Sequence, residues 1–410
     1  MPGATMSTVN AGLKELYEGK IQSQTNDEAV GLKRVEGTSD GVVDTVGGKY
    51  VTFPIRVQRN SGVSYRAESA QIAPPGNQGY QAVTIPLKYG YGRFQFTGQV
   101  MDLAAENYQA FANMADEEMD RLKVDLVKDT NRIFYGNPVG NGVLAMIMDT
   151  ATSATHTVDN VQYLEPGMVI DVLVVTSGSA TGGIQSTQTV PVTINAINET
   201  TKAVTFSSSF GPTVSGPTSA GHGIYRFGNR AAEPTGMSQI VAATGSLHGI
   251  DPATQPIWAA SVLSNAGTTQ ALSETRMILA CDQSRRKGGK ISAIFSSLGI
   301  RRAYFNLLTQ QRRYTDTKTY PGGFQGLPFN YGSEIPMVED VDAPPNKLWF
   351  VQENRLKVYR KKDWSFADSD GHILKWVRDY DLWEGMMKKY WEIGTSQRNA
   401  HVLYTDITEA

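Results

Sequence analysis

One long amphipathic stretch, Asp102–Tyr135, most constrains how this chain can fold. Its apolar residues recur every three or four positions, the period of a helix with one apolar face: Met101, Ala104, Tyr108, Phe111, Ala115, Met119, Leu122, Leu126 and Ile133. Asp102 can cap the amino terminus, and Gly136-Asn137-Pro138 ends the pattern. Such a helix spans about 50 Å. A rod of this length with one apolar stripe must pack on a long, flat surface.

Bulk composition excludes several classes of protein. The 410 residues suffice for two or three domains, and 38 Lys+Arg against 40 Asp+Glu do not indicate a general nucleic-acid binder. The single cysteine, Cys281, excludes an internal disulfide, and its apolar neighbours predict a buried helical thiol. Because no apolar run reaches membrane-spanning length and no signal-peptide core is present, we expect synthesis in a reducing cytoplasm and no membrane partner.

Two arms are predicted before the long helix. In residues 1–48 we expect an N-terminal arm with a short helix around Leu13 and an extended, polar Ile21–Gly48. Residues 49–100 predict an extended β-arm, with strands over Tyr50–Gln58 and Gln81–Leu87. The tip of the β-arm, Arg59–Gly79, has too few apolar residues for a core of its own, so it is expected to lie on a partner.

The composition changes after the helix. Residues 101–150 hold the helix and a short apolar run, and residues 151–230 are rich in Ser and Thr. Strand-like runs in this second segment are separated by turn residues: Val169–Val175, Val190–Ile197, Ala203–Phe206 and Ile224–Phe227, with a hairpin turn expected at Asn198–Lys202. We interpret residues 151–230 as a β-rich insertion, a small compact barrel.

The last part of the chain mixes helices and strands. We expect helices at Thr268–Arg286 and Leu298–Leu308. Strands are expected at Ile291–Phe295, Leu327–Phe329, Ile335–Val338, Leu348–Val351, Leu356–Tyr359, Tyr390–Ile393 and Asn399–Ile407, with Gln352–Arg355 as a tight turn and Trp383–Tyr390 as strand or helix.

A search for catalytic chemistry finds no site. The chain has no G-x-S-x-G motif, its two Gly-Gly-Lys sequences lack phosphate-loop spacing, and its five histidines show no metal-ligand pattern. Asp379 and Asp381 flank Tyr380, which we interpret as a solvated strand face and not as an acid–base pair. The basic cluster Arg285–Lys287 with Lys290 is typical of the C-terminal end of a helix, where cations interact favourably with the helix dipole. Contact with a phosphate group is the alternative interpretation. We therefore expect no enzyme, and no catalytic, cofactor or metal residues.

The order of these elements resembles a tailed-phage major capsid protein with the Hong Kong 97-type fold, an α+β fold. No single motif is diagnostic, and the resemblance covers nearly the whole chain except the insertion. It rests on these segments: Leu13–Tyr17, Tyr50–Ile55 with Gly62–Ala67, the long helix as the spine helix, Ile291–Tyr314, Gly326–Phe329, Leu348–Trp364 and Met387–Ile407. By this resemblance, residues 101–150 belong to the spine helix and peripheral domain, 231–345 to the axial domain, and 346–410 to strands returning to both.

The resemblance implies a structural function in the virion. Copies would form pentamers and hexamers of an icosahedral shell, assembled in the host cytoplasm around double-stranded DNA that is held by weak contacts. The implied partners are other copies of the chain and a portal protein at one vertex, with a decoration protein as an optional partner. Because only a short segment precedes the β-arm, we expect a separate scaffolding protein.

The residues predicted to contact neighbouring subunits are charged or aromatic: Arg59, Tyr65, Arg66, Glu68, Glu117, Glu118, Arg121, Arg312 and Arg313. Ordinary solvated surface is the alternative for each of them. Some members of the family cross-link an arm lysine to a neighbouring asparagine. Residues 59–79 contain no lysine, so we predict no such cross-link here.

Three other functions stay open at this point. An encapsulin-type compartment has the same fold and would enclose cargo enzymes. A carbohydrate-active enzyme would need a carboxylate pair in an aromatic cleft, which the sequence does not offer convincingly. A phage-tail or other filament protein is the third alternative.

Overall fold

The computed structural model describes residues 28–38, 41–44, 50–99, 108–176, 192–212, 220–310, 318–319, 325–326, 328–368 and 373–410, together with 214, 216 and 218. The short helix expected around Leu13, the beginning of the long helix, and the predicted contact residues Arg312 and Arg313 lie outside them. The same holds for the side chain of Glu117. Among the described residues, no helix is long and apolar enough to cross a membrane.

The long helix is α4 (Tyr108–Tyr135), and its predicted end is confirmed. Gly136 follows at φ +58°, a conformation that favours glycine, and its N–H donates to the carbonyl of Arg132 at 3.1 Å.

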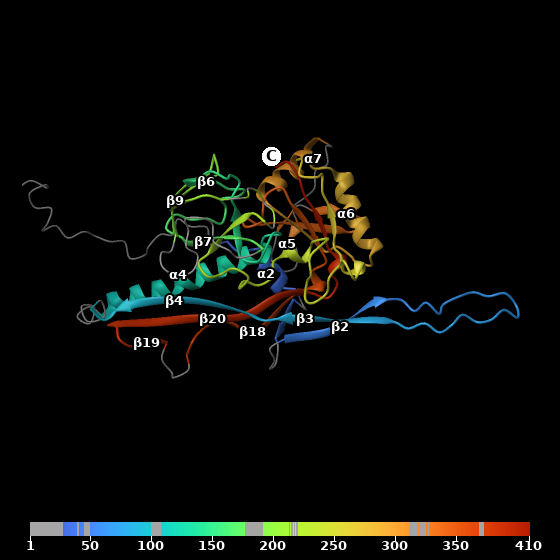
Figure 1. Ribbon diagram of the computed structural model, residues 1–410, viewed down its shortest axis with the longest axis horizontal. Helices are drawn as coiled ribbons and strands as arrows, with labels where there is room; N and C mark the ends of the chain where they lie inside the picture. The colour runs from blue at the N-terminus through green and yellow to red at the C-terminus, as the bar shows by residue number, and fades with distance from the viewer. Residues whose placement is uncertain are drawn as a thin grey trace, which may run out of the picture.

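The sheet predicted beneath the helix is present (Figure 1). We call it the long sheet: β1 (Val42–Asp44), β4 (Lys88–Thr97), β18 (Leu356–Phe366), β19 (Leu374–Trp376) and β20 (Leu382–Thr395).

Close packing joins α4 to β4. Phe94 and Phe96 are buried, and Met119 and Leu122 of the helix pack against them. A Cβ atom at Gly92 would lie only 2.6 Å from a methyl carbon of Leu126, so glycine lets the helix approach the strand. The partner surface of the apolar stripe is therefore the base of the β-arm together with strands from the end of the chain.

The β-arm is a hairpin of β2 (Tyr50–Gln58) and β3 (Gly79–Pro86), with the predicted strands confirmed. Residues 59–78 connect the two strands and extend beyond the rest of the molecule (Figure 1). Partly buried Phe53 stacks on Tyr359 of the long sheet, with ring centroids 6.5 Å apart. The base of the arm is thus packed, while its tip stands away from the body.

The β-rich segment forms its own six-stranded sheet, which we call the β-rich sheet. Its order is β5 (Val143–Met146), β10 (His222–Arg226), β7 (Val169–Val174), β8 (Val192–Asn198), β9 (Ala203–Phe210) and β6 (Ser153–Thr157). The predicted turn joins β8 to β9. Because β5 pairs with β10, this sheet begins earlier than the expected boundary at residue 151. The apolar run after α4 belongs to the core of this sheet.

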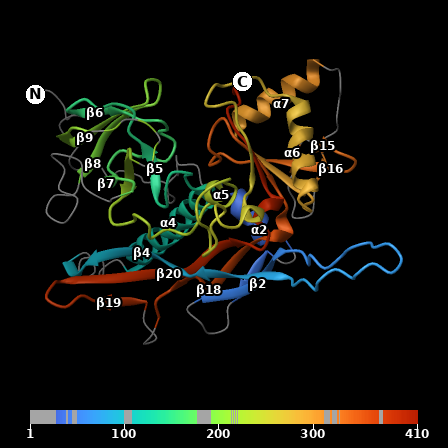
Figure 2. The same ribbon diagram turned by 45° about the vertical axis from the view of Figure 1, so that its right-hand side comes forward.

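A third sheet, the mixed sheet, contains parallel and antiparallel pairs. Its order is β11 (Ser261–Leu263), β21 (Val402–Tyr404), β17 (Leu348–Val351), β12 (Ala293–Ser296), β16 (Glu334–Glu339) and β15 (Pro328–Asn330). Helices α6 (Glu274–Arg286) and α7 (Leu298–Gln310) flank it (Figure 2). The shorter described elements are α5 (Met237–Ile240), η2 (Pro256–Trp258), η3 (Glu353–Arg355), η4 (Arg398–Ala400), β13 (Lys318–Thr319) and β14 (Gln325–Gly326).

Two local expectations are wrong. The expected helix at Thr268 begins only at Glu274, because Gln270 instead donates its backbone N–H to Asp406 and bridges to Ile407. Within the expected extended stretch Ile21–Gly48, residues Gly31–Glu36 form helix α2, whose Leu32 and Val35 are buried. Burial of those two side chains against the main core outweighs the polar composition around them.

In two other segments the structure shows a strand pairing that the sequence did not predict. The tight turn at Gln352–Arg355 does not make a hairpin, because β17 pairs in the mixed sheet and β18 in the long sheet. The chain crosses between the two sheets at this point. Trp383–Tyr390, which the sequence left open, lies within the single 14-residue strand β20.

Candidate assembly interface

The described residues contain no cluster of His, Cys, Asp and Glu that could hold a metal ion. Cys281 is buried on α6 as predicted, and burial raises the pKa of its thiol to about 12. We therefore describe the exposed surface of the molecule and the contacts between its parts. Two features stand out: an exposed arm, and a polar network that fixes the body from which the arm projects.

The tip of the β-arm is almost wholly exposed. Tyr65 is 99% exposed and Ile72 is 85% exposed. Arg59, Arg66 and Glu68 are exposed as well. Residues 59–78 make local hydrogen bonds, such as the one from the Gly62 N–H to the side chain of Asn60 at 2.7 Å. Ordering such a segment has an entropic cost, and local contacts of this kind bury little surface to offset it.

The predicted contact residues on α4 are less uniform. Glu118 is exposed, whereas Arg121 is half-buried. The structure therefore brings together only the residues of the arm tip, and α4 offers Glu118 on a separate surface. At the base of the arm, Lys88 donates from Nζ to the carbonyl of Ala231 at 2.7 Å. Lys88 is thus held by its own subunit.

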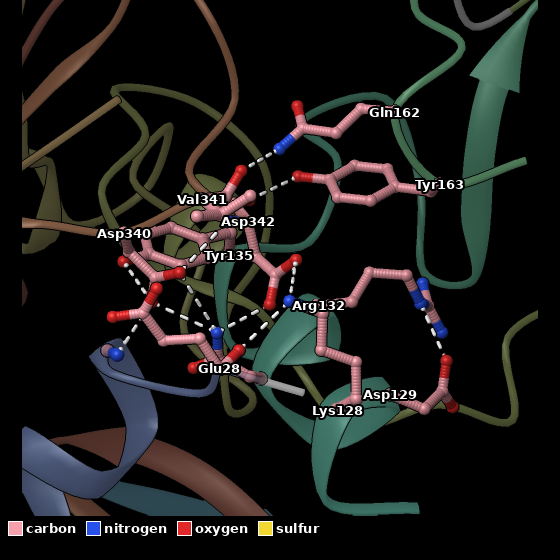
Figure 3. A network of polar contacts seen from close by, with 12 residues as sticks. Glu28, Lys128, Asp129, Arg132, Tyr135, Gln162, Tyr163, Asp340, Val341 and Asp342 are labelled. Atoms are coloured by element: carbon pink, nitrogen blue, oxygen red, sulfur yellow. Dashed lines mark hydrogen bonds and ion pairs between the residues drawn. The ribbon is translucent and has the colours of Figure 1, made fainter. Parts of the chain in front are cut away.

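A buried polar network joins four parts of the chain (Figure 3). Its centre is Asp340, which follows β16. One carboxylate oxygen of Asp340 accepts from the Gly31 N–H at 2.6 Å, from Asn131 Nδ2 at 3.0 Å and from the Tyr135 hydroxyl at 3.1 Å. The other accepts from the Asp342 N–H at 2.9 Å. A Cβ atom at Gly31 would lie 2.6 Å from the Tyr135 hydroxyl, so this crossing requires glycine.

Neighbouring charges extend the network along α4. Lys128 lies 3.0 Å from the Asp342 carboxylate, and Arg132 contacts Asp129 at 2.9 Å and Glu233 at 2.7 Å. Burial disfavours ionisation of Asp129, but Arg132 and Arg226 outweigh it, and the pKa of Asp129 is lowered. Lys128 and Arg132 therefore each lie against a carboxylate, as buried charges require.

The β-rich sheet is tied to the same centre. The Tyr163 hydroxyl donates to the carbonyl of Asp342 at 2.6 Å, and the Gln162 amide donates to the carbonyl of Val341 (Figure 3). Burial raises the pKa of Tyr163, so its hydroxyl stays protonated and donates. The network therefore fixes α2, α4, the β-rich sheet and the mixed sheet to one another.

Two further buried groups were not found from the sequence. Arg398 on η4 donates to four carbonyls, those of Gln239, Ile240, Thr244 and Gly245, at 2.9–3.0 Å. Glu392 on β20 accepts from the Thr235 N–H at 2.5 Å and the Ile393 N–H at 3.1 Å. Burial raises the pKa of Glu392 to about 7. Neither residue belongs to a local motif, so the sequence carried no signal for them.

The paired aspartates lie in a turn and not on a strand face. Asp379 has φ +69°, and residues 377–381 connect β19 to β20 with Asp379, Tyr380 and Asp381 exposed. Of the basic cluster, Arg285 and Arg286 occupy the last turn of α6, as expected from the helix dipole. Both motifs remain at the surface, outside the polar network.

Comparison with known proteins gives the fold. No family model matches the sequence, and no curated protein does. The chain is similar to a chain of the cyanophage A-1(L) capsid asymmetric unit, with a TM-score of 0.58, 14% identity, and coverage of 96% of this chain and 97% of the other. Weaker similarities include the capsid of a native GTA particle (TM-score 0.48, 11% identity, 99% of each chain). Another is the holo-SrpI encapsulin complex from Synechococcus elongatus (TM-score 0.47, 7% identity, 99% of this chain and 96% of the other).

The first of these similarities extends along both chains almost completely. Together with the long helix on the long sheet, the projecting hairpin and the mixed sheet, it shows that this chain has the α+β Hong Kong 97-type capsid fold.

Proposed function

We propose that this chain is the major capsid protein of a tailed phage, a structural protein without enzymatic activity. Copies would assemble as pentamers and hexamers into an icosahedral shell around double-stranded DNA. The observation that carries this proposal is the β-arm: a hairpin on a capsid fold, whose tip is exposed while its base is packed. A neighbouring copy would supply the surface that the tip lacks.

The buried network around Asp340 supports the same function. A shell subunit must hold its arm and its sheets in fixed directions, because small angular errors accumulate around a closed ring of copies. Four separate parts of the chain meet in this network, and the Asp342 carboxylate is paired with Lys128. We therefore assign Asp340, Asn131 and Tyr135 a structural role in keeping the subunit rigid.

The proposed contact surface comprises the arm tip, with Arg59, Tyr65, Arg66 and Glu68, and the exposed Glu118 of α4. The proposed partners are other copies, a separate scaffolding protein during assembly, a portal protein at one vertex and the enclosed DNA, with a decoration protein as an optional partner. The formal net charge of −2 is consistent with weak contacts to DNA.

Particle size and content test the proposal. We expect sedimentation and negative-stain electron microscopy of co-expressed chain and scaffolding protein to show closed shells, and nuclease-protected DNA in mature particles. Only a 44.7 kDa monomer under every assembly condition would contradict the capsid function. Shells filled with a co-purifying enzyme would favour the encapsulin-type compartment, and closed shells from this chain alone would contradict a separate scaffolding protein.

A further inference from the structure

A groove of about 380 Å³ lies where the base of the β-arm meets the mixed-sheet side of the molecule. One wall is β2, with Phe53 and Ile55 half-buried. The opposite wall is η2, where Trp258 is buried and Ile257 is 48% exposed. Segments following β20 and α6 complete the lining. The groove therefore offers apolar walls to an inserted side chain.

Its rim is positively charged. Arg56, Lys287 and Arg355 line the groove, and no carboxylate does. Lys287 donates from Nζ to the carbonyl of Ala259 at 3.1 Å. Within the described residues the guanidinium of Arg355 has no acceptor, and Arg56 makes a long contact of 3.5 Å to the Gln58 carbonyl. Three cations in a lining that holds no carboxylate would attract an acidic segment.

One lining residue has an unsatisfied polar atom. Asn399 on η4 is 8% exposed, and its Oδ1 is buried with no hydrogen-bond donor in the part of the chain that the structure describes. Buried amide oxygens nearly always accept a hydrogen bond. An oxygen that has no donor lowers the stability of the protein by about as much as a lost hydrogen bond. The groove lining thus lacks a negative charge, and its Asn399 oxygen lacks a donor.

The turn between β19 and β20 supplies these groups on another surface. Tyr380 is 65% exposed, and the exposed Asp379 and Asp381 flank it. The Val377 N–H bonds the Leu382 carbonyl at 2.9 Å, and the Gly98 N–H bonds the Asp381 carbonyl at 2.9 Å, so the turn is anchored. Arg378 makes only a loose 4.0 Å contact with Asp379.

The groove and the turn cannot meet within one molecule. Figure 2 shows β19 at one end of the long sheet and β2 at the other.

We propose that the turn Asp379-Tyr380-Asp381 of a second copy docks in this groove. Its tyrosine ring lies between the apolar walls with the hydroxyl directed at Asn399, and its two carboxylates face the basic rim. This inference rests on the proposed shell function and names one contact within it. Such a head-to-tail contact propagates from copy to copy, and it closes into a ring where the rotation between copies closes.

Engineered disulfides test which surfaces meet. Ile257→Cys and Tyr380→Cys are combined in one chain, shells are assembled as for the wild type, and a mild oxidant is added. We expect a ladder of covalent multimers on non-reducing denaturing gels that collapses to monomer with reductant. The matched control replaces Ile257→Cys with Glu199→Cys, at the exposed β8–β9 turn, and stays monomeric. Only monomer from assembled double-cysteine shells, or a ladder equal in the control, would overturn the contact.

Exchange of charges tests the electrostatics. We expect Arg56→Glu with Arg355→Glu, and separately Asp379→Lys with Asp381→Lys, to lower the yield of shells by about tenfold, because like charges then face each other. All four substitutions together should restore the yield. Lys361→Glu with Lys33→Glu, two exposed cations elsewhere, is the control and should assemble normally. Near-UV circular dichroism of each unassembled variant verifies folding.

The outcomes separate the two proposals. Wild-type chains that form no shell would contradict the proposed function itself. Wild-type shells with groove variants that assemble equally well, or folded groove and turn variants that fail even when combined, would overturn this contact alone. Tyr380→Phe adds a finer test: the hydroxyl is lost and the ring kept, so a smaller loss of shell stability than with Tyr380→Ala is expected.

Discussion

Asp340 shows how much of this fold depends on single buried groups. Its carboxylate accepts hydrogen bonds from α2, from α4 and from its own loop, and the donor at Gly31 is 309 positions away in sequence. An apolar residue there would leave several buried donors unsatisfied. An amide side chain at this position would place an N–H donor opposite the donors that now bind the carboxylate. The site therefore requires a carboxylate.

For Asp340→Asn we predict a loss of about 2–3 kcal/mol in the free energy of unfolding, because at least one buried donor loses its acceptor. Urea denaturation of the unassembled subunit measures this. Glu199→Gln, on an exposed turn, is the control and should leave the midpoint unchanged. An Asp340→Asn variant as stable as the wild type would show that the network does not stabilise the subunit.

Glu392 predicts a pH dependence. Burial raises its pKa to about 7, above the ordinary 4.5, so the folded state binds the proton more tightly than the unfolded state. The stabilisation from this proton is complete below about pH 4.5 and is lost as the pH rises to about 7. Relative to Glu392→Gln, the wild type should therefore become less stable between these limits.

The comparison with Glu392→Gln is needed because His248 and His401 titrate in the opposite sense. Burial lowers the pKa of each to about 4, so each contributes stability above pH 6.5 that is lost as the pH falls towards 4. Thermal melts of both proteins from pH 4.5 to 8 isolate the Glu392 contribution. A difference in melting temperature that does not change with pH would contradict the assignment.

At this scale the sequence predicted little. The buried thiol of Cys281 followed from its apolar neighbours on one helix. Asp340, Glu392 and Arg398 did not, because each has partners more than 150 positions away, which no local pattern encodes.

At the scale of elements, α4 determines the arrangement of the other parts. Its apolar stripe packs on β4, and the network at its C-terminal end fixes α2 and the two neighbouring sheets. The helix period, its end and its flat partner could be predicted, because periodicity reports which face is buried. The separation of β17 and β18 into different sheets could not, because two strands joined by a short turn usually form a hairpin.

Leu122→Asp tests the helix. Leu122 is half-buried against Phe94 and Phe96, so a carboxylate there would be desolvated without a partner, at a cost of about 3 kcal/mol. We predict loss of the subunit fold and of assembly, measured by circular dichroism and sedimentation. Lys123→Asp, at the adjacent exposed position, should fold and assemble. Soluble, shell-forming Leu122→Asp protein would contradict the packing.

At the scale of the whole molecule, the chain is a packed body with a projecting arm (Figure 1). The sequence predicted the arm from its poverty in apolar residues. It did not predict the groove at the base of the arm, since the residues that line it come from five separate stretches: β2, η2, η3, η4 with the residues before it, and the position after α6.

The arm also predicts how mature particles behave on denaturing gels. Residues 59–79 contain no lysine, and Lys88 is bonded to Ala231 within its own subunit. We therefore expect boiled wild-type particles to run as monomers. A ladder of multimers in the absence of any engineered cysteine would show that a covalent cross-link forms.

The most direct test of the central claim is a cryo-EM reconstruction of assembled particles. We predict a closed icosahedral shell of pentamers and hexamers of this chain, with each arm tip, including Tyr65, lying on a neighbouring copy. A reconstruction in which the chain builds a filament, or in which the arm folds back on its own subunit, would contradict it.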